Sequence, residues 1–386
     1  MRIVLISGEY PPRVGGVGDY THHLAQALVG LGHRVSVLTS SRGDDTGCAV
    51  EDDTQVEVHA DVREWGIRGF DAISRTIRNL APDVVNFQYV PHMYGRGGFA
   101  PGAALLPLRL RRVSNARIVC TLHEVASPWT VNPRRALQAA AHWAQAMLLL
   151  AASHRCVVTN QRYARQLRRW PGRRSAVHEI PVGASIQPAT VSAAGPGSIH
   201  RGLAAKDGHT LGDLSALSVG KRPEDLIAIL SALGRRAHLD LLGGLAVDQH
   251  RREWFMEQAA RAGVAKRVNW SGVLSPAGLS SSLSLLDVYV HTHDAGASTR
   301  STTLASALAH GLPVAAYRGP ETSSIFADGE NILLAPRGDV RALSERVCRL
   351  LDAPELRARL SRGARALYLQ HLTWDSIAQR FLDAAS

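Results

Sequence analysis

Asp294–Val314, DAGASTRSTTLASALAHGLPV, is the stretch of sequence that decides the fold. The apolar run before it, Leu285–Val290 (LLDVYV), is typical of a buried parallel strand. A loop of small hydroxylated residues around Arg300 follows, and then an Ala- and Leu-rich helix over Thr303–His310 that a glycine and a proline end. Open α/β sheets bind phosphorylated ligands at such loops, where a strand's carboxyl end leads into a helix N-terminus. Helix N–H groups, the Arg300 cation and the hydroxyls together suit a nucleoside diphosphate.

Strand and helix patterns alternate along the whole chain, which predicts parallel sheets with helices on both faces. In the first half we expect a helix over Asp19–Leu31 and strands at Ile3–Ile6, Val35–Leu38, Asp83–Phe87, Arg117–Leu122, Cys156–Val158 and Ile180–Val182. In the second half we expect helices at Leu226–Leu233, Arg251–Ala262, Leu279–Leu286, Val340–Leu351 and Thr373–Ala385, and strands at Leu239–Leu242, Val268–Trp270, Val288–Val290, Val314–Ala316 and Ile332–Leu334.

The segment Pro188–Gly197 has the small residues, prolines and glycines of a linker. We therefore predict an α/β protein of two doubly wound domains that face a central cleft. The predicted boundaries are a first domain over 1–187, a linker over 188–205, a second domain over 206–371 and a C-terminal helix over 372–386. Ligands are expected where the carboxyl ends of the two sheets face each other.

The composition is that of an ordinary globular protein, with 386 residues, 45% hydrophobic and 20% charged. Lys and Arg number 44 against 33 Asp and Glu, which gives a formal net charge of +11. We attribute this excess first to a general richness in arginine and second to an attraction for anions. Aromatic residues are only 5% and no zinc pattern is present, so nucleic acid is the least favoured anion.

The cysteines are far apart and form no CxxC pair, which is typical of buried small side chains in a reducing compartment: Cys48, Cys120, Cys156 and Cys348. The opening MRIVLIS predicts a strand at once and leaves no room for a signal peptide. No apolar stretch is long enough to span a bilayer. We expect a cytoplasmic protein.

Peripheral contact with the inner face of a membrane is a further hypothesis, because Gln161–Arg174 is a basic helix with Tyr163, Leu167 and Trp170 on one side. A helix face in plain solvent is the favoured alternative.

Gly8–Tyr20, GEYPPRVGGVGDY, joins the first strand to the first helix. Gly15 and Gly16 allow a ligand to approach the backbone closely, and Asp19 lies where the helix begins. The prolines and the length of this segment distinguish it from the GxGxxG fingerprint of dinucleotide-binding folds. We favour a ligand loop over a loop shaped only for folding.

Polar side chains follow two further strands. In TLHE, His123 can hydrogen-bond a sugar hydroxyl, with Glu124 to orient it or to act as a base; a purely structural histidine is an equal alternative. In NFQYVPHMYG, Gln88 and Tyr89 suit a carbohydrate or another polar acceptor, and a polar loop that covers the sheet edge is the alternative.

Lys221 and Arg222, in GKRPED, begin a helix of the second half, where cations beside a helix N-terminus suit a diphosphate. A solvated basic turn is the alternative. Glu321, in RGPETS, follows another strand and can accept hydrogen bonds from ribose or sugar hydroxyls. The sequence contains no HExxH, Walker or GxSxG motif and no paired carboxylates of a glycosidase kind.

At this point the sequence resembles a known family. Residues 9–40, EYPPRVGGVGDYTHHLAQALVGLGHRVSVLTS, closely resemble the opening of family 4 glycosyltransferases of the GT-B fold. The segments IPVGAS (180–185), SGVLSPAGLSSSLSLLDVYVH (271–291) and LASALAHGLPVAAYRGPE (304–321) resemble later parts of the same family. The resemblance extends nearly end to end and is specific for the fold rather than for the substrate.

The resemblance implies transfer of a sugar from a nucleotide diphosphate to an acceptor, usually with retention and without an essential metal or other cofactor. It implies that Gly15 and Gly16 approach the donor phosphate and the acceptor, that His123 contacts the donor sugar and that Lys221 holds the diphosphate. It also implies a C-terminal helix that crosses back to the first domain, which Thr373–Ala385 fits.

The family usually carries two glutamates with seven residues between them, and here Ser298 and Ser306 occupy those positions. In the usual enzymes the first glutamate contacts the donor sugar and the second the ribose. Arg300, Ser298 and the neighbouring threonines must supply those contacts here, or the activity is altered.

We therefore predict a GT-B glycosyltransferase that acts on a hydroxyl of a glycan, a lipid-linked or a small-molecule acceptor. The predicted catalytic residues are His123, Arg300 and Lys221. The predicted donor-binding residues are Gly15, Gly16, Arg222, Ser298, Ser301, Thr302, Ser306 and Glu321. The predicted acceptor-binding residues are Asp19, Gln88 and Tyr89.

Two alternatives stay open. A sugar-nucleotide epimerase on the same fold needs acid and base carboxylates, so the missing glutamates count against it. A scaffold protein that binds nucleotide or partner enzymes without turnover is favoured by the missing glutamates and opposed by His123, the glycine loop and the basic residues.

Overall fold

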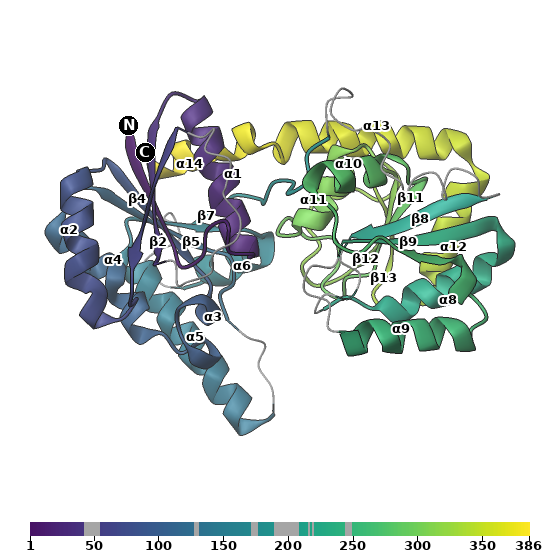
Figure 1. The fold of residues 1–386 in the computed structure, drawn as a ribbon, viewed down its shortest axis with the longest axis horizontal. Coiled ribbons are helices and arrows are strands. Elements are labelled where there is room, and N and C mark those ends of the chain that lie inside the picture. Colours follow the sequence, from purple (N-terminus) through teal and green to yellow (C-terminus); the bar gives the residue numbers. More distant parts are fainter. Residues whose placement is uncertain are drawn as a thin grey trace. The chain divides into compact units, whose positions relative to one another are not determined.

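The computed structural model describes residues 1–41, 55–126, 131–170, 177–188, 208–214, 217, 220–243 and 249–386. These residues form two compact units (Figure 1): unit 1 is Met1–Val182 with Trp374–Ser386, and unit 2 is Gly183–Thr373. The predicted linker over 188–205 lies outside the described residues except for Pro188, as does Cys48.

Unit 1 is a parallel sheet between two layers of helices, in the strand order β3-β2-β1-β4-β5-β6-β7. Its strands are β1 (Arg2–Ser7), β2 (Arg34–Ser40), β3 (Val56–Val62), β4 (Val84–Tyr89), β5 (Arg117–Leu122), β6 (Arg155–Val158) and β7 (Val177–Glu179). Its helices are α1 (Gly16–Gly30), α2 (Phe70–Leu80), α3 (Pro91–Tyr94), α4 (Pro101–Val113), α5 (Pro133–Ala152), α6 (Gln161–Arg168) and α14 (Trp374–Ala385).

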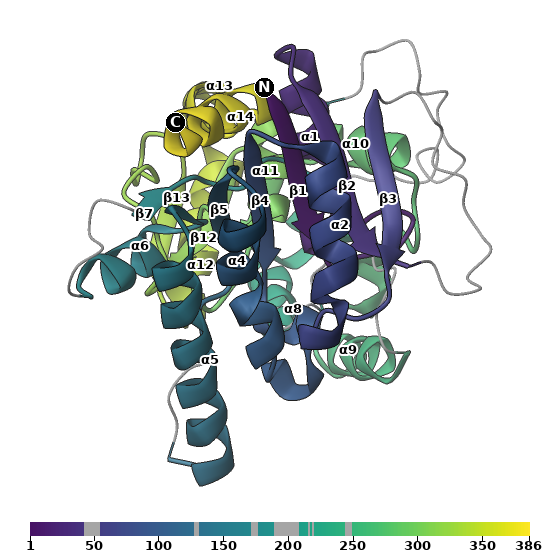
Figure 2. The same ribbon diagram turned by 90° about the vertical axis from the view of Figure 1, so that its left-hand side faces the viewer.

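The alternation of side chains along β1 explains the two layers. Ile3 and Leu5 belong to a core shared with α1 and α14, whereas Val4 and Ile6 belong to a core shared with α2, α4 and α5. Successive side chains of a strand point to opposite faces, so an all-apolar strand needs cover on both. Figure 2 shows α2 and α4 on one face of this sheet.

Helix α14 completes unit 1 although it comes last in the chain. The Trp374 ring lies 5.4 Å from that of Tyr20 and stacks on that of His23 at 5.1 Å, centroid to centroid. Phe381 is fully buried in the same core as Leu24 of α1. The C-terminal helix therefore packs against α1 in the core on the same face of the unit 1 sheet.

Unit 2 repeats the plan with the strand order β10-β9-β8-β11-β12-β13, again all parallel. Its strands are β8 (His209–Leu214), β9 (Ala237–Leu242), β10 (Val268–Trp270), β11 (Val288–His291), β12 (Val314–Arg318) and β13 (Leu333–Pro336). Its helices are α8 (Pro223–Leu233), α9 (Gln249–Arg261), α10 (Pro276–Ser284), α11 (Thr302–Ala309), α12 (Val340–Asp352) and α13 (Pro354–His371). Two doubly wound α/β units are the architecture expected from the sequence.

Several element boundaries differ from the sequence prediction. The predicted strand Ile180–Val182 is wrong, because the last strand is β7 and the chain leaves the sheet after Glu179. The apolar run Leu285–Val290 is a strand only from Val288; Leu285 ends the α10 turn and its side chain is 50% exposed. An apolar run cannot by itself show where a helical turn gives way to a strand.

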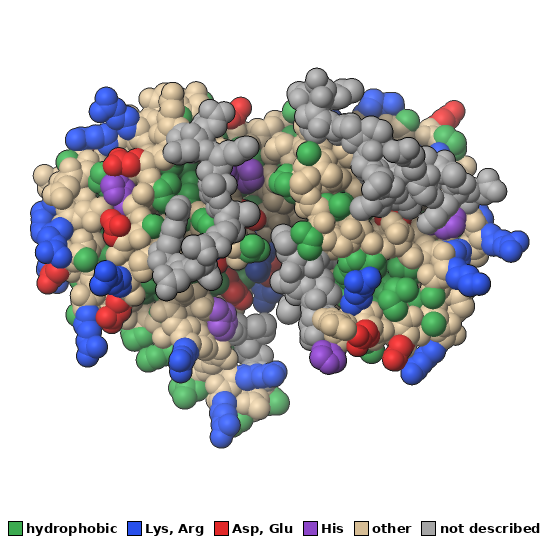
Figure 3. All heavy atoms as spheres, viewed as in Figure 1, with side chains coloured by type: hydrophobic (Ala, Val, Ile, Leu, Met, Phe, Trp, Pro, Cys, Tyr) green, Lys and Arg blue, Asp and Glu red, His purple; other side chains and the backbone are tan. Residues whose placement is uncertain are grey.

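No helix among the described residues is long and apolar enough to cross a membrane. The predicted lipid-facing side of the basic helix is wrong for Tyr163 and Leu167, which are buried in the core of unit 1, while Trp170 is 52% exposed. The described helix α6 ends at Arg168, and residues 171–174 of the predicted helix lie outside the described residues. On the face drawn in Figure 3, Lys and Arg side chains are spread over both units and do not form one patch.

We expect Phe381→Ala to lower the free energy of unfolding by about 3–5 kcal/mol, because it removes a fully buried ring that packs α14 onto α1. Chemical denaturation followed by circular dichroism measures this. Leu369→Ala, at a side chain that is 54% exposed, is the control and should change stability by less than about 0.5 kcal/mol. Equal effects of the two substitutions would contradict the role of α14.

Candidate active site

The predicted donor groups of unit 2 gather at the carboxyl ends of β8 and β11. These strands are neighbours in the sheet, but β9 and β10 lie to one side of β8 while β12 and β13 lie beyond β11. The strand order therefore reverses between them, and ligands of open α/β sheets bind at such a reversal.

The segment that begins α8 is tied to the segment that follows β11. Lys221 forms an antiparallel bridge with His293, the Arg222 N–H donates to the Thr292 carbonyl at 3.1 Å, and the Asp294 N–H donates to the Gly220 carbonyl at 2.8 Å. Backbone pairing thus brings GKRPED and the THD that follows β11 (residues 292–294) together, although about 70 residues separate them.

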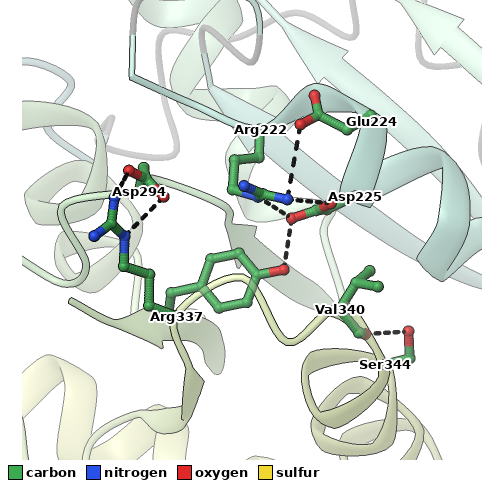
Figure 4. A network of polar contacts seen from close by, with 8 residues as sticks. Arg222, Glu224, Asp225, Asp294, Arg337, Val340 and Ser344 are labelled. Carbon is green, nitrogen blue, oxygen red and sulfur yellow. Dashed lines mark hydrogen bonds and ion pairs between the residues drawn. The ribbon is translucent and has the colours of Figure 1, made fainter.

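Two arginines, Arg222 and Arg337, lie at this edge of the unit 2 sheet (Figure 4). Arg222 donates from Nε to Asp225 at 2.6 Å, and Asp225 also accepts from the Tyr317 hydroxyl at 2.6 Å. Arg337 donates through two nitrogens to the carboxylate of Asp294. Hydrogen bonds from Arg337 lower the pKa of Asp294, so this carboxylate is ionised at neutral pH. Arg337, which the sequence analysis missed, adds a second cation that is 54% exposed.

Lys221 points inward. Its ammonium pairs with the carboxylate of Asp213 and donates to the Leu214 carbonyl at 2.6 Å, and only 3% of its side chain is exposed. Burial raises the pKa of Asp213, and the Lys221 charge opposes that rise. The ammonium is therefore held within unit 2, and its predicted contact with a diphosphate stays a prediction.

Arg300 lies beside Glu321, as the loop after β11 meets the loop after β12. The Arg300 guanidinium is 3.7 Å from Glu321 Oε2, and Ser298 donates from its hydroxyl to the same oxygen at 3.5 Å. The Glu321 side chain is 8% exposed and that of Arg300 36%. The structure thus groups three of the predicted donor residues.

Three further predicted donor residues cap or belong to α11, whereas the predicted donor residues Gly15 and Gly16 lie at the start of α1 in unit 1. Ser301 caps this helix by accepting from the Leu304 N–H at 3.2 Å, and Thr302 is its first residue. Ser306 is fully buried; its hydroxyl donates to the Thr302 carbonyl at 2.8 Å and accepts from the Ile186 N–H at 3.1 Å. Ser306 therefore holds backbone groups together inside unit 2.

His293 is a site residue that the sequence analysis missed. Its ring stacks on that of His291 at 5.9 Å between centroids, and its Nδ1 accepts from the Ala295 N–H at 3.1 Å. Burial and then the charges of Lys221 and Arg300 lower the pKa of His293 to about 4. A neutral ring with Nδ1 as acceptor carries its proton on Nε2. The bridge to Lys221 places His293 at the site, and the spacing of residues in the sequence does not predict that bridge.

In unit 1 the carboxyl ends of β4 and β5 carry a chain of polar side chains. His123 donates from Nε2 to the Gln88 amide oxygen at 2.7 Å, Gln88 donates to Asn86, and Asn86 donates to the Thr121 hydroxyl at 2.8 Å. The Tyr20 ring meets the His123 ring edge to face at 4.6 Å between centroids. The structure thus joins His123 to Gln88, one predicted for the donor and one for the acceptor.

The sequence analysis placed Gln88 and Tyr89 in a loop, which is wrong. Both are the last residues of β4 and are fully buried, with Tyr89 in the hydrophobic core. Gln88 is therefore buried, and its amide oxygen binds His123.

The carboxylate of Glu9 lies inside the glycine loop, at the start of α1. It accepts hydrogen bonds from the N–H groups of Val17 and Gly18, which lie in the first turn of α1, at 2.9 and 3.0 Å. A Cβ on Gly15 would lie 2.3 Å from the Glu9 carboxyl carbon, whereas a Cβ on Gly16 would have open space. Gly15 is thus required by Glu9, which the sequence analysis did not single out.

Within the described residues, no group of three or more His, Cys, Asp and Glu side chains is arranged to hold a metal ion.

Comparisons with known proteins show the family of this chain. The Glycosyltransferase Family 4 model matches residues 14–187, and the Glycosyl transferases group 1 model matches residues 202–367. A glycogen synthase of Mycobacterium tuberculosis is 27% identical over 98% of this chain and 92% of its own length.

Solved structures share the fold over the full chain. A sucrose-phosphate synthase from Thermosynechococcus elongatus aligns with a TM-score of 0.76 at 20% identity, covering 100% of both chains. HepE of Anabaena, in complex with UDP and glucose, aligns with a TM-score of 0.74 at 16% identity, covering 99% of this chain and 98% of its own.

The buried pair of Lys221 and Asp213 gives a first prediction for this site. Lys221→Met should cost about 3–5 kcal/mol of stability because it leaves Asp213 buried without its partner, whereas Lys221→Met with Asp213→Leu should be close to neutral. A double-mutant cycle by urea denaturation measures both. Additive losses in the double variant would show that the pair is not the reason for the loss.

The lowered pKa of His293 gives a second prediction. The unfolded chain binds a proton at about pH 6.5 and the folded protein only at about 4, so folding stability falls as pH drops through this window. We expect this group to account for a loss of about 2 kcal/mol at roughly pH 5. Thermal unfolding of wild type and His293→Gln from pH 8 to 5 checks this, since the variant should lose less. Parallel curves would contradict it.

Proposed function

We infer that this chain, which belongs to the group 1 glycosyltransferases with a family 4 N-terminal half and has the GT-B fold, acts with retention on a hydroxyl acceptor. Transfer of a sugar from a nucleotide-diphosphate donor is the activity of this class, and the matched glycogen synthase belongs to it by name. The donor is expected in unit 2 and the acceptor in unit 1.

The loop after β11 carries this proposal. It combines a half-exposed cation, Arg300, with the hydroxyl of Ser298 and the N-terminus of α11, all at the point where the strand order of unit 2 reverses. A helix N-terminus and an arginine together favour a diphosphate. Structural neighbours that hold UDP in their own structures share this fold.

We propose that these cations act on the leaving group. When the bond between the sugar and the diphosphate breaks, negative charge grows on the diphosphate oxygens. Arg300, and Arg222 with Arg337 at the same sheet edge, stabilise that charge more than they stabilise the bound donor, which lowers the barrier. No protein nucleophile is invoked: the acceptor oxygen attacks from the leaving-group side and the departing phosphate takes its proton.

Glu321 is proposed to supply the carboxylate that the loop after β11 lacks at position 298. Ser298 stands where the resemblance places a glutamate, and the Ser298 hydroxyl donates to Glu321 Oε2. Glu321 reaches this position from the loop after β12, with Arg300 3.7 Å away. A carboxylate here can accept hydrogen bonds from sugar or ribose hydroxyls while it also pairs with Arg300.

The acceptor is proposed to bind near Asp19 at the start of α1, with the His123–Gln88 pair beside it. His123 uses Nε2 on Gln88, so its ring is held in one orientation against Tyr20. Glycans, lipid-linked sugars and small molecules all carry the hydroxyl that this proposal requires.

One observation favours a second candidate, a protein of this fold that binds nucleotide or partner enzymes without turnover. Lys221 and Ser306, two of the predicted site residues, make internal contacts with Asp213 and Ile186 instead of facing solvent. Nucleotide binding without consumption of any donor would support this candidate.

Arg300→Ala should lower kcat/KM for sugar transfer by roughly 100- to 1000-fold, because it removes the main half-exposed cation of the proposed diphosphate site. A thermal-shift panel of nucleoside diphosphates and their sugars first identifies the donor, since a ligand at 100 times its Kd adds about 2.7 kcal/mol of stability. Transfer is then followed by release of the nucleoside diphosphate with and without acceptors.

Arg341→Ala is the matched control, because Arg341 is 90% exposed in the same unit and pairs only with Glu345 among the contacts described. The control should keep wild-type turnover. Wild-type turnover in Arg300→Ala as well would overturn the proposed diphosphate site.

A further inference from the structure

Unit 2 has a hollow at the end of α11 that is remote from the candidate donor loop. It has a volume of about 620 Å³ and is lined by Pro188 and by residues of α10, α11 and α13. These helices share one hydrophobic core on one face of the unit 2 sheet (Figure 1). Helix α11 begins at Thr302, next to the loop of Arg300, whereas the hollow lies at its other end, at Ala309–Gly311. Eight residues at 1.5 Å each place about 12 Å of helix between the two sites.

One face of α13 forms a wall of this hollow. Its four lining residues follow one another at intervals of three, one and three, so they lie on the same side of the helix. They are Arg362, Arg365, Ala366 and Leu369. The buried residues of α13, among them Leu367, face the core instead, while Leu369 is 54% exposed. The helix therefore presents two cations and a small apolar surface to the hollow.

Contacts within unit 2 satisfy the carbonyl groups at the base of the hollow. Arg365 donates to the Ala309 carbonyl, and its guanidinium carbon lies 5.3 Å from the centre of the Tyr368 ring. The Ser361 hydroxyl donates to the Gly311 carbonyl at 2.5 Å. The carboxyl end of a helix carries a partial negative charge that repels anions, and these two donors offset it.

The charge of the hollow comes from its two arginines. Burial lowers the pKa of His310, whose Nδ1 donates to the Ser306 carbonyl at 2.8 Å, so this ring adds no charge at neutral pH. Among the described residues that line the hollow, none is Asp or Glu. Arg362 is exposed and has no hydrogen-bond or ion-pair partner in the part of the chain that the structure describes. Its guanidinium donors are therefore available to a ligand.

We propose that this hollow is a second ligand site, which binds a small phosphorylated compound of the size of a sugar phosphate. The phosphate is held by Arg362 and by the remaining donors of Arg365, because the planar guanidinium group matches the oxygens of a phosphate. The body of the compound lies against Pro188, Ala366 and Leu369. The volume is within the roughly 300–1000 Å³ that is usual for small-molecule sites.

A phosphate group also occurs on lipids, so the source of the ligand has to be distinguished. Leu369 is the single large apolar side chain among the described residues of the lining. A surface that holds a membrane needs a broad apolar face as well as basic residues. The hollow therefore favours a free compound. This site is separate from the donor loop, so it stands or falls independently of the proposed sugar transfer.

Isothermal titration calorimetry of the full chain with glucose 6-phosphate tests the proposal. We expect saturable binding with a Kd below about 1 mM, and at least about tenfold weaker binding in Arg362→Ala. Glucose without its phosphate should give no saturable heat. Arg359→Ala is the matched control, because it removes an exposed arginine of α13 that lies one turn earlier and does not line the hollow. This control should bind glucose 6-phosphate as wild type does.

Two more variants separate the hollow from the donor loop. Ala366→Trp fills the hollow without changing its charge, and should abolish the binding of glucose 6-phosphate while thermal unfolding shows a folded protein. Arg300→Ala leaves the hollow intact and should bind glucose 6-phosphate with wild-type affinity. Sedimentation with phosphatidylcholine vesicles that contain phosphatidic acid should show no binding that depends on Arg362.

Four results would overturn the proposal. They are the absence of saturable binding in wild type, equal affinity in wild type and Arg362→Ala, wild-type affinity in folded Ala366→Trp, and vesicle binding that Arg362→Ala removes. Loss of glucose 6-phosphate binding in Arg300→Ala would likewise overturn it, because the compound would then occupy the donor loop.

Discussion

The buried ion pair between Lys221 and Asp213 is the constraint on which the candidate donor site depends. Both charges lie inside unit 2, and neither can be left alone there without a large cost in free energy. The pair fixes the segment before α8 to the end of β8. The backbone hydrogen bonds from Asp294 to Gly220 and from Arg222 to Thr292 then hold the loop after β11. The same lysine, with burial, keeps His293 neutral. The exposed arginines are therefore presented by a framework whose own charges are already paired.

The two units carry opposite charge at the edges where their sheets offer ligand sites. Unit 2 presents Arg300, Arg222 and Arg337 in contact with carboxylates that are themselves bound. Unit 1 presents Glu9 and Asp19 at the start of α1. The charged groups at these two places thus differ in sign: arginine cations in unit 2 and carboxylates in unit 1.

The sequence was sufficient for features that depend on local pattern, and insufficient for features that depend on pairing across the sheet. Apolar runs such as Val288–Val290 and Val314–Ala316 predicted strands, because a parallel strand buried on both faces must be largely apolar. The strand end at Gln88 was placed two residues early, since polar residues suggested a loop where the fold buries an amide against His123. Asp213 and Glu9 were overlooked because their partners become neighbours only after the chain has folded. The α/β class and the grouping of Arg300 with Glu321 were within reach, and the inward direction of Lys221 was not.

The replacement of glutamate by serine has different consequences at the two positions. Ser298 faces a carboxylate from another loop, so the carboxylate that is missing at position 298 has a substitute nearby in Glu321. Ser306 is fully buried and satisfies the N–H of Ile186, a backbone group that would otherwise lack a partner in the interior. A glutamate at 306 would need space and solvation that this position does not offer, so Ser306 is part of the packing between α11 and the segment at Ile186. The two serines are therefore not equivalent replacements: Ser298 lies beside a carboxylate from another loop, whereas Ser306 binds a buried backbone group.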